Sequence, residues 1–199
     1  MSTIGVRLQE KIKKIKILII DTDGVLTKPL VIWSNDDLCE NKLFETRLFC
    51  IHDGSSCWAA KAAGLKIVLV SGRASEAVHK RAKKIKIDQV YLNSINKLET
   101  LDEVIRKNGV NSDEIAYMGD DFLDLPILKA VGLAIAVKDA VEEVKEVSDY
   151  VTKKNGGEGA VAEAIRIILK SQNKWDKAVR DVLEENYAQS HNIPKTVSR

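Results

Sequence analysis

The apolar residues of the chain form short runs that alternate with longer stretches in which apolar and polar residues recur at helical spacing. The runs predict strands at residues 16–20, 66–70, 90–92, 115–118, 133–137 and 150–151. The other stretches predict helices at residues 53–63, 75–84, 98–107, 123–130, 140–147, 160–169 and 175–187, with Asp53 or Ser55 as the N-cap of the first. Because strands and helices alternate, we expect an α/β fold: a doubly wound (Rossmann-like) parallel sheet with helices on both faces.

Two regions depart from this alternation. Residues 31–33, 43–44 and 48–51 are rich in aliphatic and aromatic residues and surround a turn-forming Ser-Asn-Asp-Asp sequence, which predicts a β-hairpin inserted after the first strand. Residues 1–14 are either a mobile lead-in or a short amphipathic helix. We therefore divide the chain into a lead-in at 1–15, one domain at 16–188 and a flexible tail at 189–199.

Composition and charge narrow the class of protein. With 199 residues, 45% of them hydrophobic, the chain is long enough for one domain with a full core. Its net charge of +2, from 31 basic and 29 acidic residues, gives no reason to expect a nucleic-acid partner. We expect no membrane span and no signal peptide, and the three cysteines lack a CxxC pair, as is typical of free thiols in the cytoplasm.

The first strand ends in two acidic residues, Asp21 and Asp23, which are separated only by Thr22 and followed by Gly24. A carboxylate at the end of a buried strand is costly unless a cation or hydrogen-bond donors compensate its charge. Two carboxylates so close together indicate a metal site, and Gly24 would let the backbone turn sharply beside it. The same pattern could also be an ordinary acidic turn, so the rest of the chain has to supply the partners.

Two other strands lead into residues suited to phosphate chemistry. Ser71 follows the strand at 66–70, and Asp120 and Asp121 follow the strand at 115–118, with Lys97 at the start of the intervening helix. These side chains can converge because ligands bind beyond the carboxyl ends of the strands in a doubly wound sheet. Phosphoryl transfer to a carboxylate needs such a set, since a cation and a lysine must offset the repulsion between two anions.

The order Asp-x-Asp, Ser, Lys and Gly-Asp-Asp-x-x-Asp matches the four motifs of the haloacid dehalogenase-like superfamily, which the chain resembles. The resemblance implies that Asp21 is the nucleophile and a metal ligand. It implies that Asp23 is the general acid/base and binds the metal, Mg²⁺, through its backbone carbonyl. Asp120 would be the second metal carboxylate. Asp121 would orient the site, and Asp124 would contact the metal ligands without binding the metal itself. The residues implied to bind phosphate are Thr22, Ser71, Gly72 and Lys97.

Two alternatives belong to other classes of protein. Bacterial receiver domains are also doubly wound and phosphorylated on an aspartate beside Mg²⁺. They carry their acid pair first and their lysine last, whereas Asp120 and Asp121 follow Lys97 here, so the order of motifs argues against them. A catalytically idle binding or assembly domain on the same fold is the second alternative, and the complete set of acids argues against it.

The motifs leave room for a hairpin but for no cap domain. The segments at residues 49–54, 70–73, 116–121 and 156–161 together resemble the capless 3-deoxy-D-manno-octulosonate 8-phosphate phosphatases, over about residues 16–175. This resemblance implies a small sugar phosphate as substrate and a homotetramer whose hairpins pack together. It also implies a cytoplasmic enzyme of lipopolysaccharide biosynthesis.

Two positions depart from that family. His52 and Glu158 stand where the family commonly has arginines, and we expect both to face the sugar, as we expect of Arg73. A guanidinium binds a sugar carboxylate through two parallel hydrogen bonds, whereas Glu158 would repel it. Arg73, with Arg47 on the hairpin in second place, remains as a cation for a sugar acid. Octulosonate 8-phosphate is therefore the expected substrate, and a nonulosonate 9-phosphate is the alternative.

Overall fold

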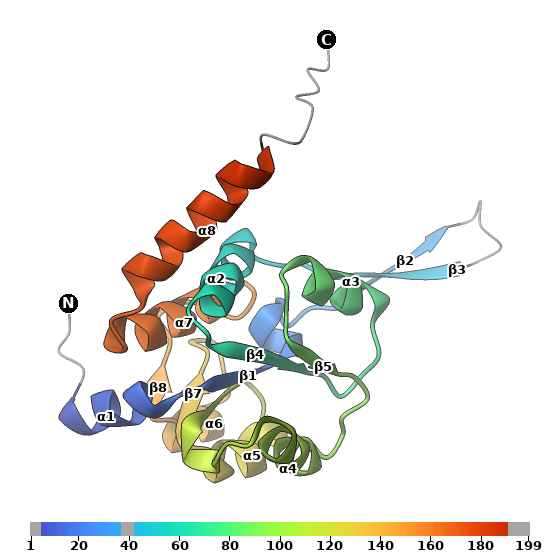
Figure 1. Cartoon of the computed structure of the whole chain (residues 1–199). Coiled ribbons are helices and arrows are strands. Elements are labelled where there is room, and N and C mark those ends of the chain that lie inside the picture. The colour runs from blue at the N-terminus through green and yellow to red at the C-terminus, as the bar shows by residue number, and fades with distance from the viewer. Residues whose placement is uncertain (1–4, 37–41, 191–199) are drawn as a thin grey trace.

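The structure, a computed structural model, describes residues 5–36 and 42–190; for residues 35–36, 42–44 and 186–190 it describes the backbone but not the side chains. A six-stranded parallel sheet with the strand order β5-β4-β1-β6-β7-β8 forms its centre (Figure 1). Its strands are β1 (Ile17–Asp21), β4 (Lys66–Val70), β5 (Gln89–Tyr91), β6 (Ile115–Gly119), β7 (Leu133–Ala136) and β8 (Tyr150–Val151). The predicted doubly wound sheet is thus confirmed, and β1 and β6, buried along their whole length, lie at its middle.

Helices cover both faces of this sheet (Figure 1). One layer contains α1 (Val6–Lys14), α2 (Ile51–Ala62), α3 (Glu76–Lys84), α7 (Ala160–Ser171) and α8 (Trp175–Ser190). The opposite layer contains α4 (Lys97–Asn108), α5 (Leu125–Ala130) and α6 (Glu142–Val147). The two faces of the sheet are apolar because both are packed against helices. No helix in the described part of the chain is long and apolar enough to cross a membrane.

The N-terminal segment is a helix from residue 6 onward. Of the two alternatives for residues 1–14, the amphipathic helix is therefore the one observed there, and residues 1–4 lie outside the described residues. Ile12 of α1 is buried in the core, and Gln172 at the end of α7 donates to the Ile15 carbonyl at 2.7 Å. At the other end, α8 continues to Ser190, and the rest of the predicted tail lies outside the described residues.

The prediction for the start of α2 was wrong. Helix α2 begins at Ile51, so neither Asp53 nor Ser55 is its N-cap. Asp53 is instead fully buried, and its Oδ1 accepts a hydrogen bond from the Ala162 N–H at 2.8 Å. Because Gly159, the N-cap of α7, has no side chain to satisfy the first N–H groups of that helix, Asp53 supplies the missing acceptor from a neighbouring helix.

The predicted hairpin is present as a separate two-stranded antiparallel sheet of β2 (Ile32–Asp36) and β3 (Lys42–Thr46), which extends away from the body (Figure 1). The predicted strand character of residues 48–51 is not observed, since Phe49 forms a single bridge with Thr27 and Ile51 already opens α2. The Thr27–Phe49 bridge closes the base of the hairpin directly after the turn that carries Asp21 and Asp23, and the chain then enters α2.

Candidate active site

The acidic motif forms a tight turn at the carboxyl end of β1. Asp21 is the last residue of the strand and is 6% exposed. The Thr22 hydroxyl is buried and donates to the Val70 carbonyl at 2.9 Å, so this side chain ties β1 to β4 and does not line the cavity beside Asp21. Gly24 has a φ of +81°, and a Cβ at this position would lie 1.9 Å from Asp120 Oδ2. Only glycine therefore lets the two acidic loops approach each other this closely.

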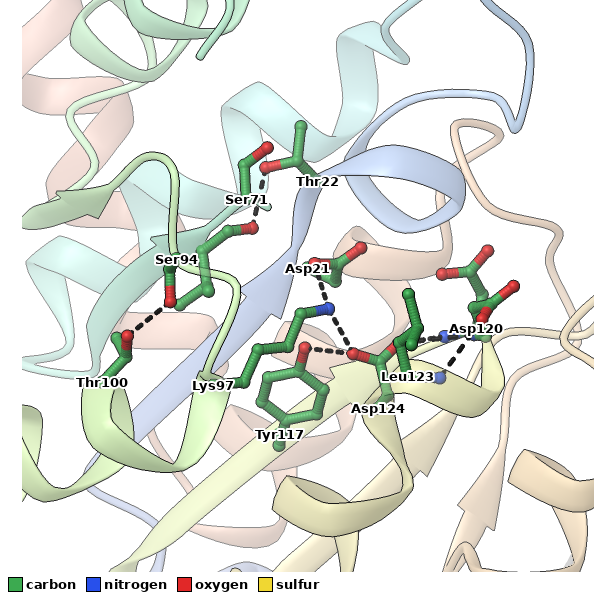
Figure 2. Close-up of polar contacts among 12 residues, drawn as sticks. Asp21, Thr22, Ser71, Ser94, Lys97, Thr100, Tyr117, Asp120, Leu123 and Asp124 are labelled. Atoms are coloured by element: carbon green, nitrogen blue, oxygen red, sulfur yellow. Dashed lines mark hydrogen bonds and ion pairs between the residues drawn. The ribbon is translucent and has the colours of Figure 1, made fainter. Parts of the chain in front are cut away.

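Lys97 connects the acids of two strands. Its Nζ lies 2.8 Å from Asp21 Oδ1 and 2.5 Å from Asp124 Oδ1, as Figure 2 shows. Lys97 is the first residue of α4, whose N-cap Asn96 accepts a hydrogen bond from the Leu98 N–H. The cap fixes where α4 begins and thereby aims the lysine at the end of β1.

Asp124 is the anchor of the site rather than a free ligand. Its Oδ1 accepts hydrogen bonds from Lys97 and from the Tyr117 hydroxyl, each at 2.5 Å. Its Oδ2 accepts from the backbone N–H groups of Asp120 and Asp121, at 3.1 and 3.3 Å. Because four donors already satisfy this buried carboxylate, its main effect is to fix the loop that carries Asp120.

Tyr117 is a residue that the sequence analysis missed. It is fully buried in β6, and burial together with nearby carboxylates raises the pKa of its hydroxyl well above the usual value, so it stays a hydrogen-bond donor. A tyrosine amid the apolar residues of a central strand is the available signal, because a buried hydroxyl there needs a polar partner.

Burial and mutual repulsion disturb the titration of the acids. Burial, together with the neighbouring acids, raises the pKa of Asp21 to about 7 although Lys97 opposes the shift. Burial and the charges of Asp21 and Asp124 raise the pKa of Asp120 to about 8. Burial alone would lower the pKa of Lys97, but the two carboxylates beside it outweigh that effect and raise it. The site thus favours extra positive charge.

We call Asp21, Asp120 and Asp124 the acid cluster. One carboxylate oxygen from each of these residues lies within 4.8 Å of the others. Hard cations such as Mg²⁺ prefer oxygen ligands of this kind, and a cation would offset the burial and the mutual repulsion that raise the pKa values of Asp21 and Asp120. Since four donors already occupy the Asp124 carboxylate, the members of the acid cluster with oxygens available for a metal ion are Asp21 and Asp120.

Asp23 faces two arginines. Its carboxylate forms ion pairs with Arg47, from the end of the hairpin, and with Arg73 Nη2 at 3.3 Å. The side chain of Arg47 is 2% exposed and also pairs with Glu45 at 2.6 Å. The sequence analysis named Arg47 only as a further cation for an acidic substrate. Nothing in the sequence of the hairpin shows that this residue turns back toward the acidic motif.

A cavity of about 490 Å³ opens over these groups. Its polar lining comprises Asp21, Asp23, Arg47, Gly72, Arg73, Ser94, Lys97, Asp120 and Asp121. Its apolar lining comprises Pro29, Leu30, Val31, Ile95 and Leu123. Ser71 lies behind the cavity wall, where its hydroxyl accepts from the Arg73 N–H at 3.2 Å and its carbonyl from the Ser94 N–H at 2.9 Å. The structure thus collects most of the predicted site residues around one space.

His52 and Glu158 do not line this cavity. They contribute instead to a second hollow of about 460 Å³ between α2, the glycine-rich loop and α7. Glu158 forms an ion pair with Lys28 at 2.7 Å, which lowers the pKa of Glu158 through the hydrogen bond and the charge of Lys28. Within one chain, neither residue is placed to touch a molecule bound beside Asp21.

Comparisons with known proteins agree with this geometry. A family model described as haloacid dehalogenase-like hydrolase matches residues 89–165. The 3-deoxy-D-manno-octulosonate 8-phosphate phosphatase of Escherichia coli is 33% identical over 168 residues, which cover 84% of this chain and 86% of that protein. The enzyme of the same description from Salmonella typhi is 31% identical and covers 88% of this chain and 90% of its own length.

Two solved structures extend the similarity to the fold. One is the 3-deoxy-D-manno-octulosonate 8-phosphate phosphatase of Moraxella catarrhalis in complex with magnesium, phosphate and the octulosonate, at 34% identity and a TM-score of 0.81 over 88% of this chain and 97% of that one. The other is a cobalt-bound phosphatase of the same description from Haemophilus influenzae, at 31% identity and a TM-score of 0.75 over 82% of this chain and 92% of that one. The chain is therefore a phosphatase and belongs to the haloacid dehalogenase-like hydrolases.

Proposed function

We propose that the protein is a Mg²⁺-dependent phosphomonoesterase that hydrolyses a small keto-acid sugar phosphate through an aspartyl-phosphate intermediate. The observation that supports it most is the position of Lys97, which joins Asp21 to Asp124 at the edge of a cavity that Asp120 also lines. A carboxylate nucleophile, a lysine and a second carboxylate for a metal ion are the groups that phosphoryl transfer requires.

In the proposed mechanism Asp21 attacks phosphorus while the bond from phosphorus to the sugar oxygen breaks, and Asp23 gives that oxygen a proton. Asp23 then takes a proton from a water molecule, which hydrolyses the aspartyl-phosphate, frees phosphate and restores Asp21. Lys97 offsets the negative charge between nucleophile and phosphate. Mg²⁺, held by Asp21, Asp120 and the Asp23 carbonyl, would supply further neutralisation of that charge when bound.

The two arginines support an acidic substrate. Arg47 and Arg73 both line the cavity, and both pair with Asp23. An anionic group of the substrate can compete for these guanidinium groups, which bind carboxylates well. If the two guanidinium groups bind the substrate in place of Asp23, the Asp23 carboxyl group becomes free to exchange protons with the reacting oxygen and with water.

Two variants test the chemistry. Asp21→Asn should abolish turnover of a panel of phosphate esters in Mg²⁺, and EDTA should silence the unmodified enzyme. Asp113→Asn is the matched control, because Asp113 is an exposed acid that pairs with Lys14 elsewhere on the surface. Near-normal activity of Asp21→Asn would refute the covalent mechanism, and an inactive panel with the unmodified enzyme would favour the idle assembly domain.

The substrate that we propose first is 3-deoxy-D-manno-octulosonate 8-phosphate, with a nonulosonate 9-phosphate as the alternative. The ratio of kcat/KM for the two compounds decides between them, and a tenfold preference for the longer sugar would reverse our order. Glu158→Arg should move that ratio toward the eight-carbon sugar only if a second copy brings Glu158 to the site, since Glu158 lines a different hollow in its own chain.

We further propose a cytoplasmic homotetramer in which hairpins pack together. Trp33 is 55% exposed and Leu48 is 46% exposed, and Leu30 on the cavity lining is 60% exposed. Exposed apolar side chains that lie together usually mark an interface. A neighbouring copy packed there would close the open side of the cavity and leave room for a small substrate only.

A further inference from the structure

The glycine-rich loop at residues 155–159 packs directly against the backbone of the acidic turn. A Cβ on Gly156 would lie 1.6 Å from the carbonyl oxygen of Gly24, and a Cβ on Gly157 would lie 2.2 Å from the Lys28 nitrogen. The Gly157 N–H donates to the Val25 carbonyl at 2.9 Å. No side chain fits between the two loops, so a shift of one must move the other.

Asp139 attaches the glycine-rich loop to the segment after β7. Its Oδ1 accepts a hydrogen bond from the Gly156 N–H at 2.8 Å. The adjacent Lys138 N–H donates to the Lys154 carbonyl at 3.2 Å, so the two segments meet through the backbone as well. The Thr152 hydroxyl adds a side-chain link, since it accepts from the Lys138 N–H at 3.1 Å and donates to the Lys154 carbonyl at 2.6 Å. Of these contacts, the one that reaches Gly156 itself is made by Asp139.

The segment of Asp139 is bound in turn to the loop that carries Asp120. The Val141 N–H donates to the Asp120 carbonyl at 2.9 Å. The Asp120 carboxylate then occupies the space beside Gly24 where a Cβ would stand. The contacts therefore close a ring that runs from Gly24 to Asp120, to the segment of Asp139, to Gly156 and back to Gly24.

We propose that Asp139 is a positioning residue for the metal site, which rests on the function proposed above. Its hydrogen bond holds the ring closed and so sets the separation between Asp120 and the turn that carries Asp21 and Asp23. Metal affinity depends on that separation, and substitution of a residue that orients a metal ligand typically weakens metal binding by about 10- to 100-fold. Asp139 does not line the cavity, so its effect on substrate binding is indirect.

The test measures Mg²⁺ binding to the full-length protein without substrate, by isothermal titration calorimetry, alongside kcat and KM. Asp139→Ala removes the acceptor and should weaken Mg²⁺ binding at least tenfold and lower kcat at subsaturating Mg²⁺, with KM for the sugar phosphate within about twofold. Asp139→Asn keeps an acceptor oxygen but removes the charge, and should restore Mg²⁺ affinity to within about threefold of the unmodified protein.

Asp149→Ala is the matched control. Asp149 also accepts a backbone N–H from a residue distant in sequence, Ala134 at 3.0 Å, but it precedes β8 and binds the start of β7, so it lies at the amino ends of the strands, away from the carboxyl ends that carry the site. It should leave Mg²⁺ affinity unchanged. Equal losses in Asp139→Ala and Asp149→Ala, or unchanged Mg²⁺ affinity in Asp139→Ala, would overturn the positioning role alone. Failure of the unmodified protein to bind Mg²⁺ would overturn the proposed function and this inference with it.

Discussion

The guanidinium of Arg47 forms an ion pair with the carboxylate of Asp23, although the two residues belong to the hairpin and to the turn after β1. Arg47 is almost completely buried by its partners and also pairs with Glu45. A residue of the inserted hairpin therefore reaches into the site of the central sheet. Under the proposed function, this contact links Arg47, which lines the cavity, to Asp23, the proposed acid/base group.

We expect Arg47→Met to impair acidic substrates selectively. The ratio of kcat/KM for octulosonate 8-phosphate to that for a neutral sugar phosphate should fall at least tenfold, because a charge-assisted hydrogen bond contributes about 1.5–3 kcal/mol. Steady-state kinetics on both substrates measures it. Any effect of the substitution on Asp23 is common to both sugar phosphates and cancels in the ratio. An unchanged ratio would therefore show that Arg47 does not bind the carboxylate of the substrate.

Gly24→Ala should abolish activity. The new methyl group would lie 1.9 Å from Asp120 Oδ2, and the residue would have to keep a φ of +81°. Gly109→Ala is the control, because Gly109 has a φ of +63° with open space around its Cβ position. It should cost about 1–2 kcal/mol of unfolding free energy and leave kcat unchanged. Comparable losses of activity in the two variants would mean that backbone strain, not the clash, is responsible.

Stability without metal should depend on pH. The pKa values of Asp21 and Asp120 are raised to about 7 and about 8 in the folded protein, from 3.8 as the ordinary value. A raised carboxyl pKa favours folding at low pH, and this contribution is lost as the pH rises through the folded pKa. In EDTA, Tm should therefore fall between pH 6 and pH 8.5.

Magnesium should reverse this trend, because the cation competes with protons for the same oxygens. The rise in Tm caused by Mg²⁺ should grow with pH, as differential scanning calorimetry can measure. In Asp120→Asn, the rise in Tm caused by Mg²⁺ should depend much less on pH. The buried Asp53, whose pKa burial raises to about 6, affects the pH dependence of Tm at lower pH and does so equally in both proteins. A Mg²⁺ increment that is the same at pH 6 and pH 8.5 would contradict the assignment of Asp21 and Asp120.

The proposed assembly predicts that Trp33→Ser shifts the protein to smaller species. Trp33 is 55% exposed on β2, and a polar residue there would remove apolar contact between hairpins. Sedimentation velocity at micromolar concentration would report the change, with Leu183→Ser on α8 as a control for loss of exposed apolar surface. If the unmodified protein sediments as a 22.1 kDa monomer, the tetramer is ruled out.

The sequence predicted the sheet because β1, β4 and β6 are long apolar runs whose burial leaves few alternatives, and it predicted the convergence of Asp21, Lys97 and Asp120 because all stand at carboxyl ends or helix starts. The prediction failed where a side chain binds a residue of another helix or strand. Asp53 looked like a local cap but caps α7, and Tyr117 looked like core but holds Asp124. Local patterns carry no information about such partners.

The separation between the hairpin and the main sheet has a consequence for how this enzyme can diverge. Among the described residues, strands β2 and β3 pair only with each other, and the Thr27–Phe49 bridge lies at their base. Substitutions along the hairpin can therefore alter what enters the cavity without disturbing the hydrogen bonds that hold Asp21, Lys97 and Asp124. Under selection, substrate preference can then change along the hairpin while Asp21 and Lys97 stay in place, and Arg47, which pairs with Asp23, is the hairpin position where such a change would also affect the chemistry.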